Sequence, residues 1–390
     1  MEDVVDCSVL IPVLNEERYI GPAVAAMRRQ RFAGTIEYVF ADGGSRDRTR
    51  EALAAFAAED PRIRVVDNPS ASVSSGLNVA LAHARGRWVV RMDAHTVYPD
   101  DYVALGVARL QRGGTRWVSG PQVPVGHGPV SRAVSLALSA PLGRGASRKW
   151  RDGGGRSGPE YELDTGVFAG VWERTTLIEY GGWDERWPRN SDSEMAARFI
   201  EAGDTLICVP AMGAEYVPRD SVRKLFDQYL RYGEYRARTA TAHPGSLRGS
   251  LLLPPAVVVT AAASVAPVGR GGGALRALRA ARGLARLGMG GYAAALAAGA
   301  ARSRAAAQAP GDAALVPVVL AAMHFGHGLG QLRGWARYGP PLAAMARLLG
   351  LSGLSRRLEP TPEPTYAPSL DEPPLASDPP DRPRLSAIAG

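Results

Sequence analysis

An aspartate and a histidine, Asp93 and His95, lie two positions apart, directly after the short apolar run 88–92. From the end of a strand, this carboxylate and imidazole can point the same way and together hold one divalent metal ion. Such a metal neutralises a diphosphate and makes it a better leaving group. The three-residue motif is weak on its own, so its meaning depends on the elements that surround it.

Two more polar clusters follow apolar runs nearer the N-terminus. Asn15 and Glu16 come after the first run, and Asp42 comes after the second. The two glycines that follow Asp42 let the backbone approach a ligand closely, and the carboxylate can accept hydrogen bonds from a base or a ribose hydroxyl. Neither a Gly-x-Gly-x-x-Gly fingerprint nor a phosphate-binding lysine loop follows the first run, which disfavours a classical dinucleotide or P-loop site.

The second half of the chain adds acids and a polar helix face. Asp192 and Glu194 lie in the first turn of a predicted helix, where the helix dipole favours negative charge. Gln228 and Arg231 are three residues apart on a later predicted helix, next to Tyr232. They can meet a phosphate and a sugar hydroxyl, or they can be ordinary surface residues.

The elements that must position these side chains follow from the apolar pattern. Continuous apolar runs bounded by glycine, proline or polar turns predict four buried strands, at 7–14, 36–41, 62–66 and 88–92. A helical pattern lies between each strand and the next. This alternation predicts an α/β fold, a doubly wound and mostly parallel sheet with helices on both faces. Ligands of such sheets sit beyond the carboxyl ends of the strands.

The pattern is less regular further on. After a predicted helix at 100–112 and a strand at 116–120, residues 121–160 are rich in Gly, Arg, Ser and Pro. We interpret them as a mobile loop near the site or a solvated linker. Residues 163–170 predict another strand, and residues 220–236 predict the helix that carries Gln228.

Composition narrows the class of protein. The chain has 390 residues, a net charge of +8 and only two cysteines, Cys7 and Cys208, each in an apolar run. Both cysteines are predicted to be core residues in a reducing compartment. The acidic start of the chain predicts no cleavable signal peptide. A positive net charge can favour binding to nucleic acid, to an anionic membrane or to a phosphorylated ligand.

The location of the basic residues favours a membrane surface. Residues 251–269 and 313–332 carry no Asp, Glu, Lys or Arg and are long enough to cross a bilayer, and 289–301 is a weaker candidate. Between them, residues 275–286 place an arginine every three to four positions against leucine and alanine, as in a helix that lies on anionic lipid. Burial of these segments in a soluble domain is the alternative. A nucleic-acid partner is not expected, because stacking aromatics do not interleave with these arginines.

Three regions follow from these patterns. We predict a catalytic domain at 1–245, a membrane-associated helical region at 246–350, and a proline-rich disordered tail at 351–390. The positive-inside rule places the arginine-rich segment on the cytoplasmic side of the inner membrane. The catalytic domain lies on that side too if 251–269 re-enters the membrane instead of crossing it.

Over roughly residues 7–240 the chain resembles the family 2 glycosyltransferases of GT-A fold, and it looks closest to the bacterial succinoglycan-type glucosyltransferases of exopolysaccharide synthesis. Pro12, Asn15 and Glu16 are similar to the family's opening strand and its end. Ala41-Asp42-Gly43-Gly44-Ser45-Arg46-Asp47 resembles the Asp-Asp-Gly-Ser segment, with glycine in place of the second acid. Gly76 and Asn78 match the Gly-x-Asn that precedes the metal motif.

The resemblance extends to the metal motif and the later helices. Asp93-Ala94-His95 stands where Asp-x-Asp is usual, so that His95 replaces the second acid, and imidazole favours Mn²⁺ over Mg²⁺. Asp192 stands at the position of the family's general base. Gln228, Arg231 and Tyr232 resemble Gln-x-x-Arg-Trp, with tyrosine in place of tryptophan.

The resemblance implies an inverting, metal-dependent glycosyltransferase. Its expected donor is a nucleotide diphosphate sugar, such as a UDP-sugar, bound by Pro12, Asn15, Glu16, Asp42, Gly76, Asn78, Asp93, Gln228, Arg231 and Tyr232. Its expected acceptor is a lipid-linked or polysaccharide hydroxyl at the cytoplasmic membrane face. Two alternatives remain open: transfer onto polyprenyl phosphate, which needs no general base, and a non-catalytic membrane scaffold of this fold.

Overall fold

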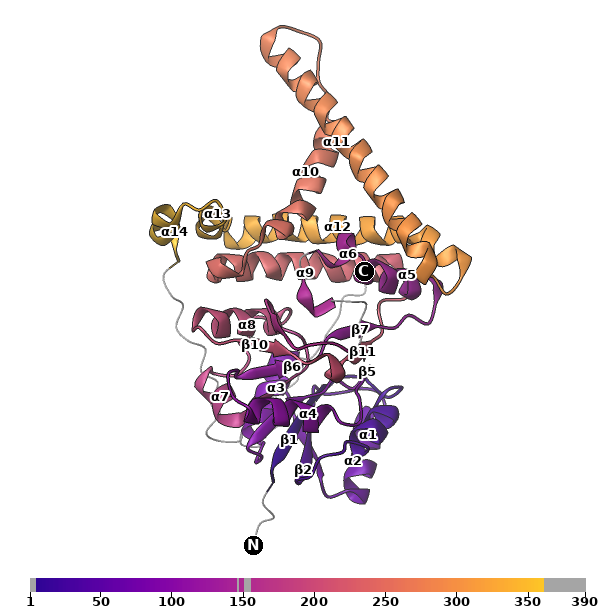
Figure 1. Ribbon diagram of the computed structural model, residues 1–390, viewed down its shortest axis with the longest axis vertical. Coiled ribbons are helices and arrows are strands. Elements are labelled where there is room, and N and C mark those ends of the chain that lie inside the picture. Colours follow the sequence, from indigo (N-terminus) through magenta and orange to yellow (C-terminus); the bar gives the residue numbers. More distant parts are fainter. Residues whose placement is uncertain (1–4, 146, 151–155, 361–390) are drawn as a thin grey trace, which may run out of the picture.

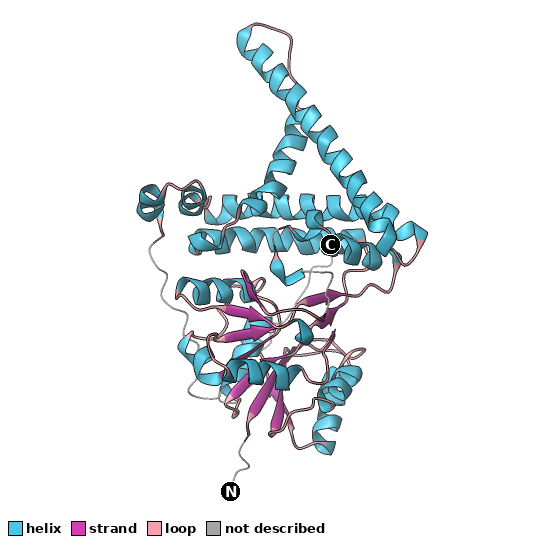
Figure 2. Cartoon of the chain, viewed as in Figure 1, coloured by secondary structure: helices cyan, strands magenta, loops and turns pink. Residues whose placement is uncertain are grey.

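The computed structural model describes residues 5–145, 147–150 and 156–360, arranged as an α/β body under a layer of long helices (Figures 1 and 2). The body contains an eight-stranded sheet of order β3-β2-β1-β4-β9-β6-β10-β8. Its strands are β1 (Cys7–Val13), β2 (Ile36–Asp42), β3 (Ile63–Asp67), β4 (Trp88–Arg91), β6 (Trp117–Ser119), β8 (Tyr161–Leu163), β9 (Gly170–Glu173) and β10 (Leu206–Cys208). Strands β3, β2, β1 and β4 are parallel, so the predicted sheet is confirmed.

Helices cover both faces of this sheet because successive residues of a buried strand point to opposite sides. In β1, Val9 and Ile11 join the core under one set of helices, and Leu10 joins the core on the other face. The first set is α1 (Ile20–Arg28), α2 (Thr49–Glu59) and α4 (Tyr102–Gln111). The second set is α3 (Val73–Ala82), α7 (Arg174–Glu179) and α8 (Ser191–Glu201).

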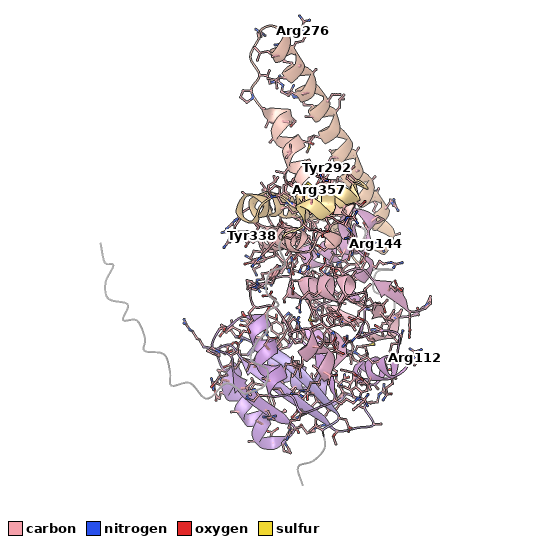
Figure 3. All side chains as sticks on the ribbon, turned by 90° about the vertical axis from the view of Figure 1, so that its left-hand side faces the viewer. Arg112, Arg144, Arg276, Tyr292, Tyr338 and Arg357 are labelled. Carbon is pink, nitrogen blue, oxygen red and sulfur yellow. The ribbon has the colours of Figure 1, made fainter. Side chains whose placement is uncertain are left out.

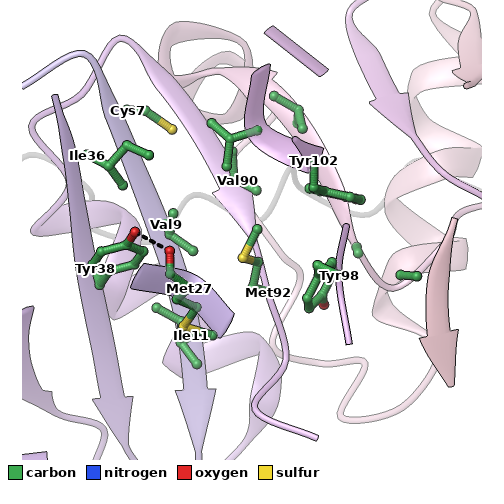
Figure 4. Packing of buried hydrophobic residues seen from close by; sticks show 14 of the residues in the cluster. Cys7, Val9, Ile11, Met27, Ile36, Tyr38, Val90, Met92, Tyr98 and Tyr102 are labelled. Carbon is green, nitrogen blue, oxygen red and sulfur yellow. Dashed lines mark hydrogen bonds between the residues drawn. The ribbon is translucent and has the colours of Figure 1, made fainter. Parts of the chain in front are cut away.

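Figure 4 shows the first of these two cores, where the Tyr38 hydroxyl donates a hydrogen bond of 2.6 Å to the Met27 carbonyl. Cys7 and Cys208 are free and buried in the two cores, as predicted.

Two predictions for the middle of the chain were wrong. The region 121–160 contains β7 (Gln122–Pro124), α5 (Pro129–Ser139) and the short α6 (Pro141–Arg144), so much of it is neither loop nor linker. Strand β7 pairs with β11 (Ala214–Tyr216), which also pairs with β5 (Thr96–Val97). The predicted strand 163–170 is split into the ends of β8 and β9 with a bend between them.

Two long helices form the layer above the sheet, α9 (Val222–Ala242) and α12 (Pro310–Tyr338), and they run side by side (Figure 1). Glycines allow their backbones to touch. A Cβ atom added at Gly330 would lie 2.0 Å from the Leu230 carbonyl oxygen, and one at Gly233 would lie 2.1 Å from that of His327. Helix α12 also packs on α5.

A helical hairpin projects from this layer, made of α10 (Leu253–Val265) and α11 (Gly273–Ser303), with Arg276 near its far end (Figures 1 and 3). The predicted segment 289–301 is therefore the inner half of a helix that begins in the basic segment. Within the described residues, only Gly311–Tyr338 is long and apolar enough to cross a membrane, and more than half of its most apolar part is buried inside the protein.

The C-terminal prediction needs a correction. Residues 351–390 were predicted to be disordered, but α14 (Ser352–Leu358) lies in that region, shortly after α13 (Leu342–Leu348). The remainder of the predicted tail, from residue 361, lies outside the described residues.

Candidate functional site

The candidate site begins where β1, β2 and β4 end side by side. Because these strands are parallel neighbours, the residues that follow them meet at one edge of the sheet. The Asn15 backbone N–H donates to the Ser45 hydroxyl (2.9 Å), and the Arg46 N–H donates to the Asn15 side-chain oxygen (2.8 Å). Asn15 adopts a left-handed backbone, with φ of 55°. The two loops are therefore held as one rim.

Asp42 is buried at this rim, and its carboxylate is partly committed to the turn. It accepts hydrogen bonds from the Ser45 hydroxyl (2.6 Å) and backbone N–H (3.2 Å). Arg50 forms an ion pair with the other carboxylate oxygen at 3.5 Å. Local bonds of this kind fix the direction in which the remaining lone pairs point.

Asp93 follows β4 and is paired with a residue that was not predicted. Arg91 donates to both Asp93 carboxylate oxygens, at 3.0 and 3.2 Å, and the Tyr98 hydroxyl accepts from the Asp93 backbone N–H at 2.8 Å. The Arg91 side chain is only 7% exposed, so its charge needs this partner. Arg91 could have been recognised from the sequence, because it is a charged residue inside an otherwise apolar predicted strand.

Helix α8 brings Asp192 within electrostatic range of this ion pair. Burial acts to lower the pKa of Arg91, but the carboxylates of Asp93 and Asp192 together raise it above its usual value. One guanidinium is thus within the electrostatic reach of both carboxylates. Asn190, which precedes α8, donates from its amide to the Tyr232 carbonyl (3.0 Å), so α9 and the start of α8 are held together.

The predicted metal ligand His95 is in contact with Glu16. A ring nitrogen of His95, Nδ1, lies 3.2 Å from the Glu16 carboxylate, and this bond and the nearby Asp93 raise the imidazole pKa against the opposing effect of burial. A carboxylate on Nδ1 is the usual support for a metal bound by the other ring nitrogen.

The described residues contain no group of three or more His, Cys, Asp or Glu side chains that could hold a metal ion. The assignment of Asp93 and His95 as metal ligands stays a prediction.

The predicted site residues on α9 differ in burial. Gln228 is buried and donates from its amide to the hydroxyls of Tyr232 (2.9 Å) and Tyr216 (3.2 Å). Arg231 is exposed. Gln228 thus pairs with Tyr232, while Arg231 lies one turn from Gln228 at the exposed edge of the same helix, and its contact with a ligand stays a prediction.

Gly76 and Asn78 of α3 have structural partners. The Asn78 amide donates to the Trp183 carbonyl (2.8 Å) and accepts from the Trp183 N–H (2.9 Å). A Cβ atom on Gly76 would lie 3.3 Å from that of Pro12, so the glycine lets α3 approach β1. Contacts of these residues with a nucleotide sugar stay predictions.

Two further cations near Asp192 were not assigned from the sequence. Lys149 follows α6, and burial lowers its pKa while Asp192 opposes that effect. Arg236 of α9 donates to the Ser193 hydroxyl at 3.1 Å. Arg151 of the same basic stretch lies outside the described residues.

An ion network centred on the buried Glu194 anchors the α8 helix behind Asp192. Glu194 accepts two hydrogen bonds from Arg198, at 2.7 and 3.0 Å, and lies 3.6 Å from His243. Glu201 lies 2.7 Å from the other nitrogen of His243. Burial alone would lower the pKa of His243, but the two glutamates raise it to about 9.

Stability is expected to fall between pH 6.5 and 9 because of His243. Its folded pKa of about 9 exceeds the usual 6.5, so the imidazolium stabilises the folded state fully below pH 6.5 and loses that effect as the pH rises through 9. The contribution is at most about 3 kcal/mol. Denaturant unfolding of wild type and His243→Gln across this range measures it, with the exposed His127→Gln as the matched control. Equal pH slopes in wild type and His243→Gln would contradict the assignment.

Comparison with known proteins identifies the family. A model of the family "Glycosyl transferase family 2" matches residues 8–155, which include the strand-end cluster but not Asp192. The succinoglycan biosynthesis protein ExoA of Rhizobium meliloti is 31% identical over 237 residues, which cover 60% of this chain and 70% of the relative. The uncharacterized glycosyltransferase EpsJ of Bacillus subtilis is 31% identical over 97 residues, 25% of this chain and 26% of that protein.

Solved structures are more distant. The mannosyltransferase PcManGT from Pyrobaculum calidifontis, in complex with GDP-Man and Mn²⁺, has a TM-score of 0.45 and 20% identity, covering 89% of this chain and 87% of that one. TarS 1–349 of S. aureus, in complex with UDP, has a TM-score of 0.45 and 13% identity, covering 86% and 92%.

Proposed function

The chain belongs to glycosyl transferase family 2 and is a glycosyltransferase, and from that premise we propose that it moves a sugar from a nucleotide diphosphate sugar to an acceptor hydroxyl with inversion. The observation that carries this proposal is the ion pair of buried Arg91 with Asp93 at the strand edge, with hydrogen bonds of 3.0 and 3.2 Å, and Asp192 lies within electrostatic range of the same guanidinium. Two carboxylates near one cation can take separate roles in a single displacement, Asp93 on the side of the leaving diphosphate and Asp192 on the side of the attacking hydroxyl.

The donor end lies at the strand edge. Asp42 and the rim that Asn15 and Ser45 hold together face the nucleoside, and Asp93 and His95 hold the divalent metal. When bound, Mn²⁺ or Mg²⁺ supplies positive charge that stabilises the departing diphosphate. Glu16 orients the His95 ring, and Arg91 keeps the Asp93 carboxylate in position.

The acceptor end lies at the start of α8. Asp192 accepts the proton of the acceptor hydroxyl as that oxygen attacks the anomeric carbon from the face opposite the diphosphate. The hydrogen bond from Asn190 to α9 and the ion network behind Asp192 limit the motion of this carboxylate. Inversion follows because a single displacement reverses the configuration at the anomeric carbon.

The test of this function is a panel of nucleotide sugars with the detergent-solubilised full chain, Mn²⁺ or Mg²⁺, and lipid-linked saccharide acceptors. We expect release of nucleoside diphosphate with one donor class and formation of an inverted glycosidic bond. Neither donor consumption nor transfer with any metal and acceptor in the panel would reject the proposal and favour a scaffold role.

We further propose that the α10–α11 hairpin attaches the enzyme to the cytoplasmic face of an anionic membrane. Leu284 and Leu287 on α11 are 69% and 74% exposed, and Val265 at the end of α10 is 78% exposed. Two arginines of α11 hold the hairpin together: Arg279 donates to the Gly269 carbonyl in the connecting segment, and Arg286 donates to the Ser264 carbonyl in the last turn of α10. Apolar side chains beside a row of arginines suit the headgroup region of anionic lipid.

Replacing Leu284 and Leu287 with glutamate is expected to weaken binding to phosphatidylglycerol vesicles by more than about tenfold, because each exposed leucine can bury roughly 1.5–3 kcal/mol of apolar surface. Flotation of the full chain with vesicles measures this. The matched control is Val217→Glu, an exposed site on the catalytic body. Unchanged flotation of the double variant, or equal binding to neutral phosphatidylcholine vesicles, would contradict the proposed attachment.

A further inference from the structure

A cavity of about 520 Å³ lies beside helix α8, on the side of Ser193, the residue next to Asp192. The end of β8, the segment that follows α9, and α13 form its other walls. Three arginines from separate parts of the chain line it: Arg236 of α9, Arg248 from the segment after α9, and Arg347 of α13. No donor-site residue of the strand edge contributes to this lining.

Among the described residues, two of the three arginines that line the cavity form no ion pair with a carboxylate. Three of the four carboxylates in the lining have cationic partners outside these two arginines. Asp164 pairs with Arg248 at 2.5 Å, Glu201 with His243 at 2.7 Å, and Asp204 with Arg116 at 3.6 Å, while Glu162 is exposed. In the part of the chain that the structure describes, neither Arg236 nor Arg347 forms an ion pair within 4.0 Å, although Asp192 is within electrostatic reach of Arg236.

Two buried atoms in the lining also have no hydrogen-bond partner among the described residues, the Ser246 hydroxyl and one carboxylate oxygen of Asp164. The hydroxyl is a donor for an anionic oxygen, and the carboxylate oxygen is an acceptor for a ligand hydroxyl. A buried polar atom of this kind is costly unless a ligand or water satisfies it.

An exposed apolar surface adjoins the cavity through Arg347. Helix α13, which carries this arginine, continues into α14, and leucines of this pair are exposed, Leu342 by 52%, Leu349 by 74% and Leu351 by 49%. Arginine-lined space next to exposed leucines fits an amphiphile that carries a phosphate group beside a hydrocarbon chain.

We propose that this cavity binds the phosphate groups of a lipid-linked acceptor, with Arg236 and Arg347 on the phosphate oxygens and the hydrocarbon chain along the α13–α14 leucines. This inference rests on the proposed function, because it assigns the acceptor of the same transfer. The saccharide then extends past Ser193 toward Asp192. The phosphate is held away from the reacting centre, so the nucleophile is a sugar hydroxyl that needs a general base.

The experiment is equilibrium binding of farnesyl diphosphate to the full chain in neutral detergent. Arg347→Gln is expected to weaken binding by at least about tenfold, since a charge-assisted arginine–phosphate contact is lost, and Arg347→Lys is expected to retain part of it. Arg347 is exposed, so the variant should fold. The matched control is Arg304→Gln, an exposed arginine outside the cavity, with wild-type affinity expected.

Two competitors separate the possible sources of the phosphate. Inorganic pyrophosphate is expected to bind more weakly than farnesyl diphosphate, and phosphatidylglycerol micelles are expected not to displace it. Equal affinity of pyrophosphate, displacement by phosphatidylglycerol, no binding by the wild type, or unchanged binding by Arg347→Gln would each overturn the assignment. UDP binding to the wild type with Mn²⁺ is measured separately, so that failure of the donor site is distinguished from failure of this acceptor site.

Discussion

Replacing Asp192 with asparagine is expected to lower kcat for transfer by about 10²–10⁴-fold, because the acceptor hydroxyl loses its general base. Affinity for the nucleoside diphosphate is expected to persist, since the donor site is built from the ends of β1, β2 and β4. Steady-state transfer rates and UDP titration in the presence of Mn²⁺ measure the two effects separately.

The matched control for this variant is Asp220→Asn, which removes an equally charged but exposed carboxylate paired with Lys224 before α9. It should transfer at the wild-type rate. Full activity in Asp192→Asn would remove Asp192 from the proposed role. It would favour transfer onto an acceptor that is already anionic, such as polyprenyl phosphate.

Replacing Asp93 with asparagine is expected to abolish the metal dependence of donor binding, with at least tenfold weaker affinity, because the metal loses its carboxylate ligand. The same change leaves the buried Arg91 guanidinium without its partner, and breaking a buried ion pair typically costs about 3–5 kcal/mol. A lower Tm is therefore expected as well. Nucleotide-sugar titration with and without Mn²⁺, together with thermal unfolding, reports both effects.

The double variant Arg91→Gln with Asp93→Asn separates stability from metal binding. It replaces the ion pair with two neutral amides, so part of the lost Tm should return while the metal dependence stays absent. If Asp93→Asn alone still shows the wild-type response to metal, Asp93 is not a metal ligand, and the proposed donor chemistry would need another cation.

The strands of the sheet could be predicted from the sequence because each is a short apolar run bounded by turn residues. The shared edge then followed from parallel pairing, which brought Asn15, Asp42 and Asp93 together. Helix α5 was missed because serine, arginine and flanking glycines hide an apolar stripe that shows only against α12. Around Gly166, a Cβ atom would lie 2.0 Å from the Asp192 carbonyl oxygen, and a strand prediction does not anticipate so close an approach.

Most of the features that could not be predicted depend on contacts between residues far apart in the sequence. The ion pair of Arg91 with Asp93 is local in sequence, but its link to Asp192 depends on how α8 packs against the sheet. The apolar run of α12 fits a bilayer or a helix partner equally well, since hydropathy does not distinguish them. Glycines at four-residue spacing, Gly326, Gly330 and Gly334, were the available sign of a helix partner.

The glycine contacts between α9 and α12 have a practical consequence for dissecting the chain. A fragment that stops at the predicted boundary, residue 245, keeps α9, which supplies Gln228 and Tyr232. It lacks α12, whose backbone lies against that of α9. We infer that the α/β body and the helix layer of α9 and α12 fold as a single unit. Expression trials aimed at a soluble core would then do better to delete the tip of the hairpin than to truncate the C-terminal third.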